Sequence, residues 1–250
     1  MRRAFQVLSC IVLFAGVFGL MPLHALEQSV SVEFVIVRTE ATNAKRAAEH
    51  AIDASNVVVW LSPLDRTADT SGGFPARKET PKLVQRNKTF EPHLLVVPVG
   101  TSVEFPNRDP FFHNIFSLYD GKRFDLGLYE SGTSRSVRFD RPGVSYLFCN
   151  IHAEMSAVVI ALDTPYFAIS NRAGQAVMSD VPDGAYRLSV WDERASPEEL
   201  KALARTITVG ETGRHLGTIR IKETGSAPPP HKNKYGLDYV PPPKSDYERP

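Results

Sequence analysis

The chain has 250 residues, with 29 Lys and Arg against 28 Asp and Glu, and 42% of its residues are hydrophobic. This near-neutral composition, with no run of basic residues, argues against nucleic-acid binding and against a strongly charged docking surface. The length suffices for two small domains rather than one large enzyme.

The N-terminus has the pattern of a secretory signal peptide. Met1-Arg2-Arg3 precedes an apolar run from Val7 to Met21 that is too short for an ordinary membrane span. We expect cleavage after Ala25, so residues 1–25 are the predicted signal peptide. The mature protein is then periplasmic or secreted, without integral membrane association. A retained anchor is the alternative, because Leu23 is bulky for a position that usually holds a small residue.

Cleavage would leave a single cysteine. It removes Cys10, so Cys149 remains as the one thiol of the mature chain. A single thiol in an oxidising compartment permits no internal disulfide and needs either protection or a function.

Most of the mature chain has the pattern of short strands separated by turn residues, which predicts an all-β fold. The expected strands lie at residues 29–39, 56–61, 94–99, 102–105, 134–139 and 144–149. Residues 41–55 carry alanines at helical intervals and predict a short helix or an ordered linker, whereas residues 67–81 are typical of a loop. In the strand at 144–149, Ser145, Leu147 and Cys149 should face the core. The opposite face is also apolar, so another part of the chain should cover it.

A second β unit is expected over residues 163–222. Its main signal is Val181 to Trp191, which combines a Pro-Asp-Gly turn with alternating apolar residues. Residues 197–205 predict one short helix, with Ser196 as its N-cap and Pro197 at its first position. Residues 223–250 carry two runs of three prolines and few apolar residues, and predict a disordered or extended tail. Binding of a partner by this tail is the alternative.

The strongest functional motif is Cys149-Asn150-Ile151-His152-Ala153-Glu154-Met155, with His113 upstream in Phe111-Phe112-His113-Asn114. A thiolate, two imidazoles and a weak axial thioether form the donor set that selects copper and suits one-electron transfer. The spacing lets one tight turn direct Cys149, His152 and Met155 to a common centre. His113 must then come from another strand.

Other interpretations of these residues remain open. Cys149 alone could be a small buried hydrophobe. Zinc is a weaker alternative, because its closed sites rarely recruit a thioether. A Cys-His hydrolase is weaker still, because its nucleophile and base are typically far apart in sequence. His93 is a possible additional ligand, while His50, His215 and His231 are scattered and suggest no second metal centre.

Residues 84–162 resemble the cupredoxins, or blue-copper proteins, and the short Cys-x-x-His-x-x-Met loop is most similar to that of amicyanin, with plastocyanin as a more distant likeness. The resemblance implies a Greek-key β-sandwich over residues 26–162. It also implies one type 1 copper ion held by His113, Cys149, His152 and Met155. Asn114 is the implied outer residue that holds the site. The 181–191 segment resembles small transthyretin-like, carboxypeptidase-regulatory-like sandwiches, which would occupy residues 163–222.

The implied function is that of a periplasmic carrier of single electrons, not an enzyme. Its partner would be a redox protein that no residue identifies. By this resemblance His152 would serve as the electron port, inside an apolar patch for which Phe111, Phe112 and Ile151 are candidates. The alternative function is copper storage, delivery or sensing without an electron-transfer role.

Overall fold

A computed structural model describes residues 29–40, 53–65, 74, 79–118, 121–210, 215–223 and 231–239. Within these ranges the chain is almost entirely β, with one short helix, which confirms the predicted all-β class. No helix in the described part of the chain is long and apolar enough to cross a membrane. The predicted signal peptide lies outside the described residues, as do residues 41–52 and most of the predicted loop at 67–81.

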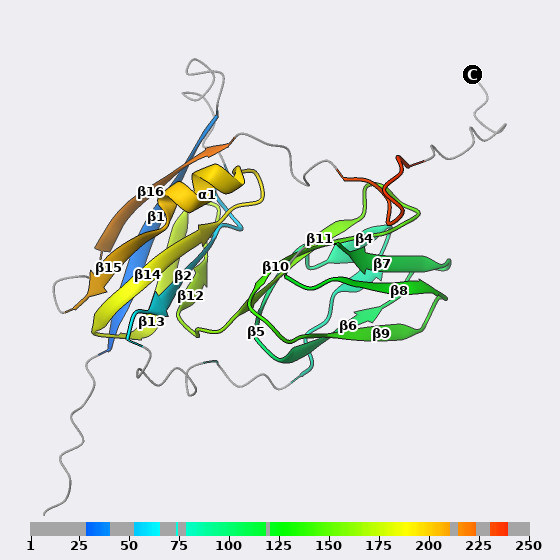
Figure 1. Cartoon of the computed structure of the whole chain (residues 1–250), viewed down its shortest axis with the longest axis horizontal. Helices are drawn as coiled ribbons and strands as arrows, with labels where there is room; N and C mark the ends of the chain where they lie inside the picture. Colours follow the sequence, from blue (N-terminus) through cyan, green and yellow to red (C-terminus); the bar gives the residue numbers. More distant parts are fainter. Residues whose placement is uncertain are drawn as a thin grey trace, which may run out of the picture.

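The strands form two units, which Figure 1 shows side by side. The central unit comprises the described residues between 79 and 162, and the flanking unit comprises those between 29 and 63 together with those between 167 and 223. Each unit has its own buried cluster of apolar side chains drawn from more than one sheet. The proposed metal ligands all belong to the central unit.

The central unit holds nine of the described strands. They are β3 (Val84–Arg86), β4 (Thr89–Glu91), β5 (Leu94–Pro98), β6 (Thr101–Pro106), β7 (His113–Ser117), β8 (Phe124–Tyr129), β9 (Ser134–Phe139), β10 (Gly143–Phe148) and β11 (Ser156–Leu162). Five strands form one sheet in the order β5-β11-β10-β7-β8, while β6 pairs with β9 and β3 with β4. Val103 and Phe139, from the β6–β9 pair, pack in one core with Leu147 and Val159 of the larger sheet.

Strand β10 positions the start of the metal motif. It lies between β11 and β7, so both of its edges are paired. Ser145, Leu147 and Cys149 are each 0% exposed, which confirms that this face of the strand points into the core. The residue that follows β10 is therefore fixed at the edge of a packed sandwich rather than on a free loop.

The flanking unit contains two sheets and the single described helix. Its elements are β1 (Ser29–Glu40), β2 (Val58–Pro63), β12 (Phe167–Ile169), β13 (Gln175–Pro182), β14 (Gly184–Trp191), α1 (Pro197–Leu203), β15 (Arg205–Val209) and β16 (His215–Glu223). The sheets have the orders β13-β1-β16 and β12-β2-β14-β15. Ser196 caps α1 as predicted, because its hydroxyl accepts a hydrogen bond from the Glu199 N–H at 3.2 Å. The helix ends at Leu203, because Ala204 already has extended backbone angles.

The first two strands belong to the flanking unit, which differs from the expected division of the chain at residues 26–162 and 163–222. β1 pairs antiparallel with β13 and parallel with β16, and β2 lies between β12 and β14. Phe34 and Ile36 of β1 are buried in the core of that unit. Alternation of apolar residues predicts a strand and its buried face, but it does not select a partner strand more than 100 residues away.

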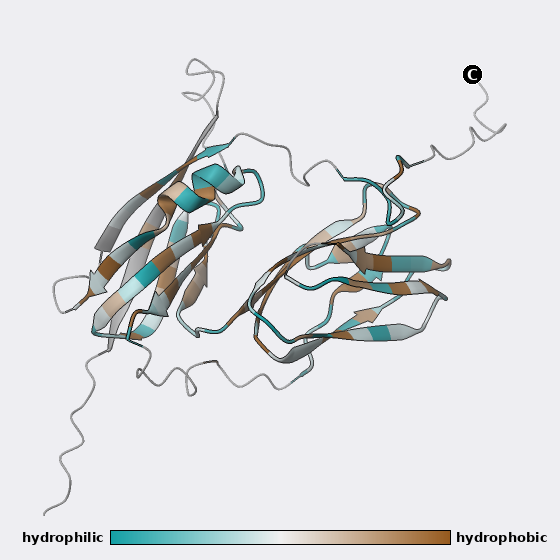
Figure 2. Cartoon of the chain, viewed as in Figure 1, coloured by the Kyte–Doolittle hydropathy of each residue, from teal (hydrophilic) through white to brown (hydrophobic). Residues whose placement is uncertain are grey.

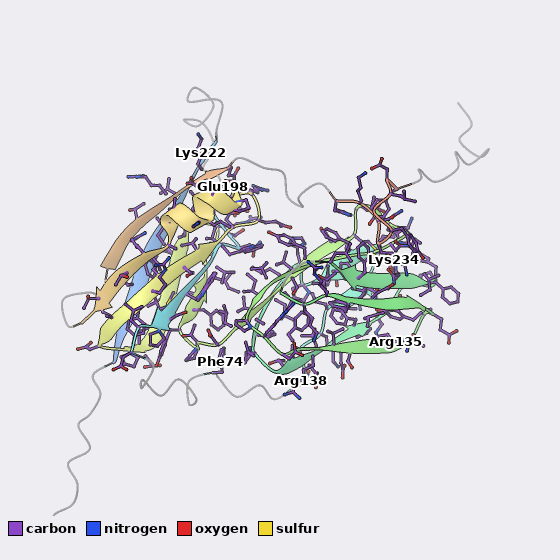
Figure 3. All side chains as sticks on the ribbon, viewed as in Figure 1. Phe74, Arg135, Arg138, Glu198, Lys222 and Lys234 are labelled. Carbon is purple, nitrogen blue, oxygen red and sulfur yellow. The ribbon has the colours of Figure 1, made fainter. Side chains whose placement is uncertain are left out.

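An apolar cluster joins the two units and covers most of the outer face of β10, as the sequence required. Val144 and Tyr146 pack there with Val58 and Trp191 of the flanking unit. The Trp191 Nε1–H donates a hydrogen bond to the Tyr146 hydroxyl at 3.2 Å. Figure 2 shows apolar stretches on the strands of both units, and Figure 3 shows side chains, including Phe74, filling the space between them.

The remaining described segment, residues 231–239, lies against the central unit and is called the strap here (Figure 1, red). The sequence predicted a disordered or extended tail over residues 223–250. Instead, the His231 ring stacks on the Phe148 ring with centroids 3.8 Å apart, and Lys234 pairs with Asp125 at 2.7 Å. The low apolar content of the tail gave no signal for this packing, because polar contacts provide most of it. Residues 224–230 and 240–250 lie outside the described part.

Candidate metal centre

The metal motif forms a closed loop between two neighbouring strands. Cys149 directly follows β10, and Met155 directly precedes β11. The Cys149 N–H donates to the Met155 carbonyl at 3.2 Å, and the Met155 N–H donates to the His152 carbonyl at 3.1 Å. These two bonds close the loop, called the metal loop here and defined as residues 149–155. His152 is thereby held over the end of the sheet.

His113 reaches the same place from a different strand. It is the first residue of β7, which pairs with β10 through Phe116 and Phe148. The ring of His113 is fully buried, and its Nδ1 lies 3.7 Å from the Cys149 Sγ. The strand order therefore explains how a residue far upstream meets the metal loop.

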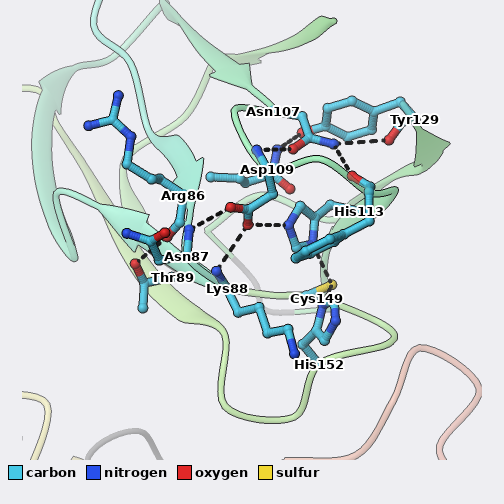
Figure 4. A network of polar contacts seen from close by, with 12 residues as sticks. Arg86, Asn87, Lys88, Thr89, Asn107, Asp109, His113, Tyr129, Cys149 and His152 are labelled. Atoms are coloured by element: carbon cyan, nitrogen blue, oxygen red, sulfur yellow. Dashed lines mark hydrogen bonds and ion pairs between the residues drawn. The ribbon is translucent and has the colours of Figure 1, made fainter. Parts of the chain in front are cut away.

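Figure 4 shows the imidazoles of His113 and His152 converging on the Cys149 sulfur. The His152 Nδ1 lies 3.6 Å from Sγ, and the donor atoms of all three residues lie within 4.8 Å of one another. Among the described residues this is the one such group of histidine, cysteine and carboxylate side chains. The structure thus brings together three of the four residues predicted to form the site, each through the atom that can bind a metal.

The two sulfur–nitrogen distances fit bonds to a single metal ion. A zinc ion bonds sulfur at about 2.3 Å and nitrogen at about 2.05 Å. At bond angles between tetrahedral and trigonal, these lengths place the sulfur and the nitrogen about 3.6–3.8 Å apart. The observed sulfur–nitrogen distances of 3.6 and 3.7 Å agree with that range. A thiolate with two imidazoles favours copper when the remaining contact is weak.

Met155, the proposed fourth contact, lies at the end of the metal loop and is buried. It is 0% exposed and belongs to the same core cluster as Cys149. Its backbone is fixed by both hydrogen bonds that close the metal loop. Its role as an axial ligand stays a prediction.

A buried carboxylate that was not among the residues expected from the sequence orients His113. The Asp109 Oδ2 lies 2.7 Å from the His113 Nε2, so the Nδ1 of the ring is left to face the thiol. Asp109 also accepts hydrogen bonds from the backbone N–H groups of Asn87 at 2.6 Å and Lys88 at 2.9 Å. Burial alone would raise the pKa of Asp109, but the hydrogen bonds from Lys88, His113 and Asn87 outweigh it and lower that pKa. A carboxylate on the outer nitrogen of a ligand histidine fixes its tautomer and raises its basicity.

Asn114, the outer residue suggested by the resemblance, also contacts the site. Its side-chain Nδ2 donates to the Asp125 Oδ1 at 2.7 Å. Burial raises the pKa of the Cys149 thiol, and hydrogen bonds from the backbone N–H groups of Asn114, Ile151 and His152 oppose that rise.

Burial, followed by the proximity of His113, lowers the pKa of His152, so its ring is neutral near pH 7. A neutral ring keeps a lone pair for a metal.

The other histidines named from the sequence do not join this group. His93 lies at the contact between the units, where its Nε2 bonds Glu193 at 2.7 Å and its Nδ1 bonds the Ser156 carbonyl at 3.1 Å. His231 lies on the strap, against the metal loop but away from the sulfur. His50 and the side chain of His215 lie outside the described part.

Aromatic and aliphatic side chains surround the exposed side of the centre. The Phe111 ring lies 5.1 Å from the His113 ring and 5.7 Å from the His152 ring, centroid to centroid. Phe112 is 56% exposed and Ile151 is 47% exposed. Two of the three predicted patch residues are therefore at the surface, while the Phe111 ring packs against both imidazoles, which also contact each other at 5.0 Å.

Neither a protein-family model nor a curated protein sequence matches this chain. Solved structures similar to part of it include a purple cupredoxin from Nitrosopumilus maritimus, which is 26% identical over 33% of this chain and 99% of that one, with a TM-score of 0.31. A reduced variant of amicyanin is 20% identical over 35% of this chain and 86% of its own, with a TM-score of 0.32. A copper-containing nitrite reductase from Thermus scotoductus SA-01 is 24% identical over 36% of this chain and 24% of its own, with a TM-score of 0.33. These likenesses concern about a third of the chain.

Proposed function

We propose that this protein binds one copper ion in the central unit and carries single electrons to or from a partner redox protein. The observation that supports this most strongly is the placement of His113 and His152, whose Nδ1 atoms lie 3.7 and 3.6 Å from one buried thiol. A bound copper ion supplies one-electron redox chemistry at such a donor set. Met155 is the proposed weak axial contact, which completes a type 1 site.

The residues around the donors favour a site that changes little between oxidation states. Asp109 holds the His113 ring by its outer nitrogen, and the closed metal loop holds His152. Cys149 and His113 are fully buried, so water has little access to two of the donors. Ligands that cannot rearrange keep the same geometry when an electron enters or leaves, which makes transfer fast.

The partly exposed His152 is the proposed route for the electron. Its ring contacts Phe111 and stands next to Ile151, whose side chain is 47% exposed. An apolar rim around a redox site lets a partner approach closely without paying a large desolvation cost for charged groups. The partner is expected to be a redox protein with a matching apolar face.

Export through the predicted signal peptide would place this site in the periplasm or outside the cell. A single thiol buried at a metal site suits an oxidising compartment, because coordination protects it from oxidation. The flanking unit, which we expect to be transthyretin-like, contributes none of the proposed ligands. Its proposed role is to cover the outer face of β10.

Copper titration of the mature protein, followed by visible spectroscopy and voltammetry, tests this proposal. The expected result is one copper per chain, an intense thiolate-to-Cu(II) charge-transfer band and a reversible potential. Cys149→Ser should abolish the band, whereas Ser156→Ala, just beyond the metal loop, should retain it. Copper binding without that absorption refutes the type 1 assignment, and an irreversible or inaccessible potential favours storage, delivery or sensing instead.

A further inference from the structure

The strap touches the metal loop at three points along its length. The His231 Nε2–H donates to the Ala153 carbonyl at 3.1 Å, and the Lys234 N–H donates to the Asn150 Oδ1 at 3.0 Å. The Tyr239 hydroxyl donates to the carbonyl of Cys149 at 2.9 Å. The strap therefore bonds the loop on both sides of His152, and one of its contacts is the backbone of the thiol residue itself.

An aromatic stack anchors the strap to the strand that leads into the loop. The His231 ring lies over the Phe148 ring with centroids 3.8 Å apart and planes 24° apart. The Tyr239 ring meets His231 edge-on at 5.4 Å. Phe148 immediately precedes Cys149, so this stack covers the part of the outer face of β10 that the flanking unit does not reach.

A second anchor connects the strap to the other half of the site. The Lys234 Nζ lies 2.7 Å from the Asp125 Oδ2, and the Oδ1 of the same carboxylate accepts from the Asn114 side chain at 2.7 Å. Asn114 follows His113 and directs its backbone N–H toward the Cys149 sulfur. Figure 3 shows Lys234 beside the central unit, among the side chains of the strap. The strap thus bridges the β7–β8 side of the site and the metal loop.

The strap has a defined turn of its own, which keeps its anchors in place. The Oδ1 of Asn233 accepts from the N–H groups of Tyr235 at 3.0 Å and Leu237 at 3.1 Å. Gly236 has a φ of +77°, a left-handed conformation that favours glycine, and its N–H donates to the Asn233 carbonyl at 2.9 Å. A preformed turn costs less conformational entropy on docking than a free tail.

We propose that the strap is a positioning element of the metal centre, in which His231, Lys234 and Tyr239 hold the metal loop against β7 and so control copper retention and potential. The copper part of this inference rests on the proposed function, whereas the control of loop motion does not. Loss of contacts that orient metal ligands typically lowers metal affinity or activity by about 10–100-fold. The contacts of the strap with Phe148, Asn150 and Ala153 reach residues next to a proposed ligand, and the contact with Cys149 reaches the ligand backbone itself. The contact with Asp125 reaches the site through Asn114.

The test compares the full mature chain with two variants and one matched control. Tyr239→Phe removes only the hydroxyl that bonds the Cys149 carbonyl, and a deletion of residues 231–250 removes the whole strap. Tyr235→Phe is the control, because it removes the same group from a strap residue that is 70% exposed and contacts Lys234 of the strap itself rather than the metal loop. Tyr239→Phe keeps the test decisive if the deletion exposes Phe148 and causes aggregation.

The first measurement uses the metal-free protein and follows amide hydrogen exchange at Cys149 and Met155. We expect exchange to rise about 10-fold or more in the deletion and by a smaller factor in Tyr239→Phe, with no change in Tyr235→Phe. The second measurement is the rate of Cu(I) transfer to a chelator together with the reduction potential. Transfer should accelerate by about 10–100-fold without the strap, and the potential should shift.

The outcomes separate this inference from the proposed function. If exchange in the metal loop is the same in Tyr239→Phe and the deletion as in the parent chain, the strap does not position the loop. If exchange rises but copper transfer and potential stay constant, the strap holds the loop without acting on the metal, and the copper part of the inference fails. If the parent chain binds no copper, the proposed function fails while the exchange measurement still decides the role of the strap.

Discussion

Asp109→Asn is the most informative single substitution near the site. The side chain of Asp109 is 5% exposed, and its Oδ2 contacts both the Lys88 N–H at 2.9 Å and the His113 Nε2 at 2.7 Å. Its Oδ1 accepts from the Asn87 N–H at 2.6 Å. An asparagine has one amide NH₂ group in place of an oxygen, so in either orientation that group faces at least one N–H donor.

The expected cost follows from that mismatch. One buried donor left without an acceptor destabilises the metal-free protein by about 1–3 kcal/mol. In the more favourable orientation His113 keeps an oxygen, but a neutral one, and such hydrogen bonds are roughly half as strong as charge-assisted ones. We therefore expect copper affinity to fall by about 10–100-fold, which is about 1.4–2.7 kcal/mol. The potential should rise, because a less basic imidazole stabilises Cu(II) less.

Competition titration with a copper chelator, voltammetry and urea unfolding measure these three effects separately. Asp140→Asn is the matched control, since the Asp140 carboxylate is 54% exposed and contacts only the surface Lys122 at 2.9 Å among the ion pairs of the described residues. It should leave all three quantities unchanged. A lower free energy of unfolding with unaltered copper affinity and potential in Asp109→Asn would show that the carboxylate stabilises its loop but does not act through His113.

Three further substitutions test other parts of the structure. Met155→Leu should retain copper and raise the potential, because a weak sulfur donor is lost while the strong donors remain; loss of copper would assign Met155 another role. Tyr146→Phe should lower the free energy of unfolding by about 1–3 kcal/mol, because the buried Trp191 N–H loses its acceptor. The visible spectrum should stay intact, and an unchanged free energy in urea unfolding would contradict this expectation. The hydrogen bond to Glu193, opposed by burial, raises the pKa of His93. This pair should therefore contribute stability that is fully present below pH ~6.5 and is lost as the pH rises through the raised pKa. The contribution should be less than about 1 kcal/mol, because the His93 side chain is 42% exposed. A His93→Gln variant whose pH–stability curve parallels that of the parent would exclude this contribution.

The convergence of Cys149 and His152 could be predicted from the sequence because their arrangement is local. Cys149 and His152 share one short loop, and β10 fixes which way the thiol points through its two-residue period. The expectation that His113 joins them from another strand rested on a family resemblance, and the pairing of β7 with β10 brings it to the metal loop. The helix at Pro197 was predictable for a similar reason, since its cap lies three residues from the N–H that it binds.

Asp109 illustrates what the local pattern could not provide. It precedes His113 by one turn of irregular chain around Pro110, where neither a helical nor a strand period applies. Its carboxylate is held by backbone groups of Asn87 and Lys88, which come from the hairpin between β3 and β4. No spacing in the sequence connects these segments. An aspartate a few residues before a candidate ligand histidine is the one signal that could have suggested the pair.

The assignment of β1 and the packing of the strap were missed for opposite reasons. β1 has a clear strand pattern, but its partners β13 and β16 follow it by more than 130 residues, and burial of Phe34 and Ile36 is satisfied equally well by any apolar face. The strap has almost no apolar pattern, and its attachment depends on individual hydrogen bonds to Asn150, Ala153 and Cys149. Hydrophobic periodicity therefore predicts which residues are buried, while the contacts that hold this metal loop come from polar groups whose partners only the folded chain brings together.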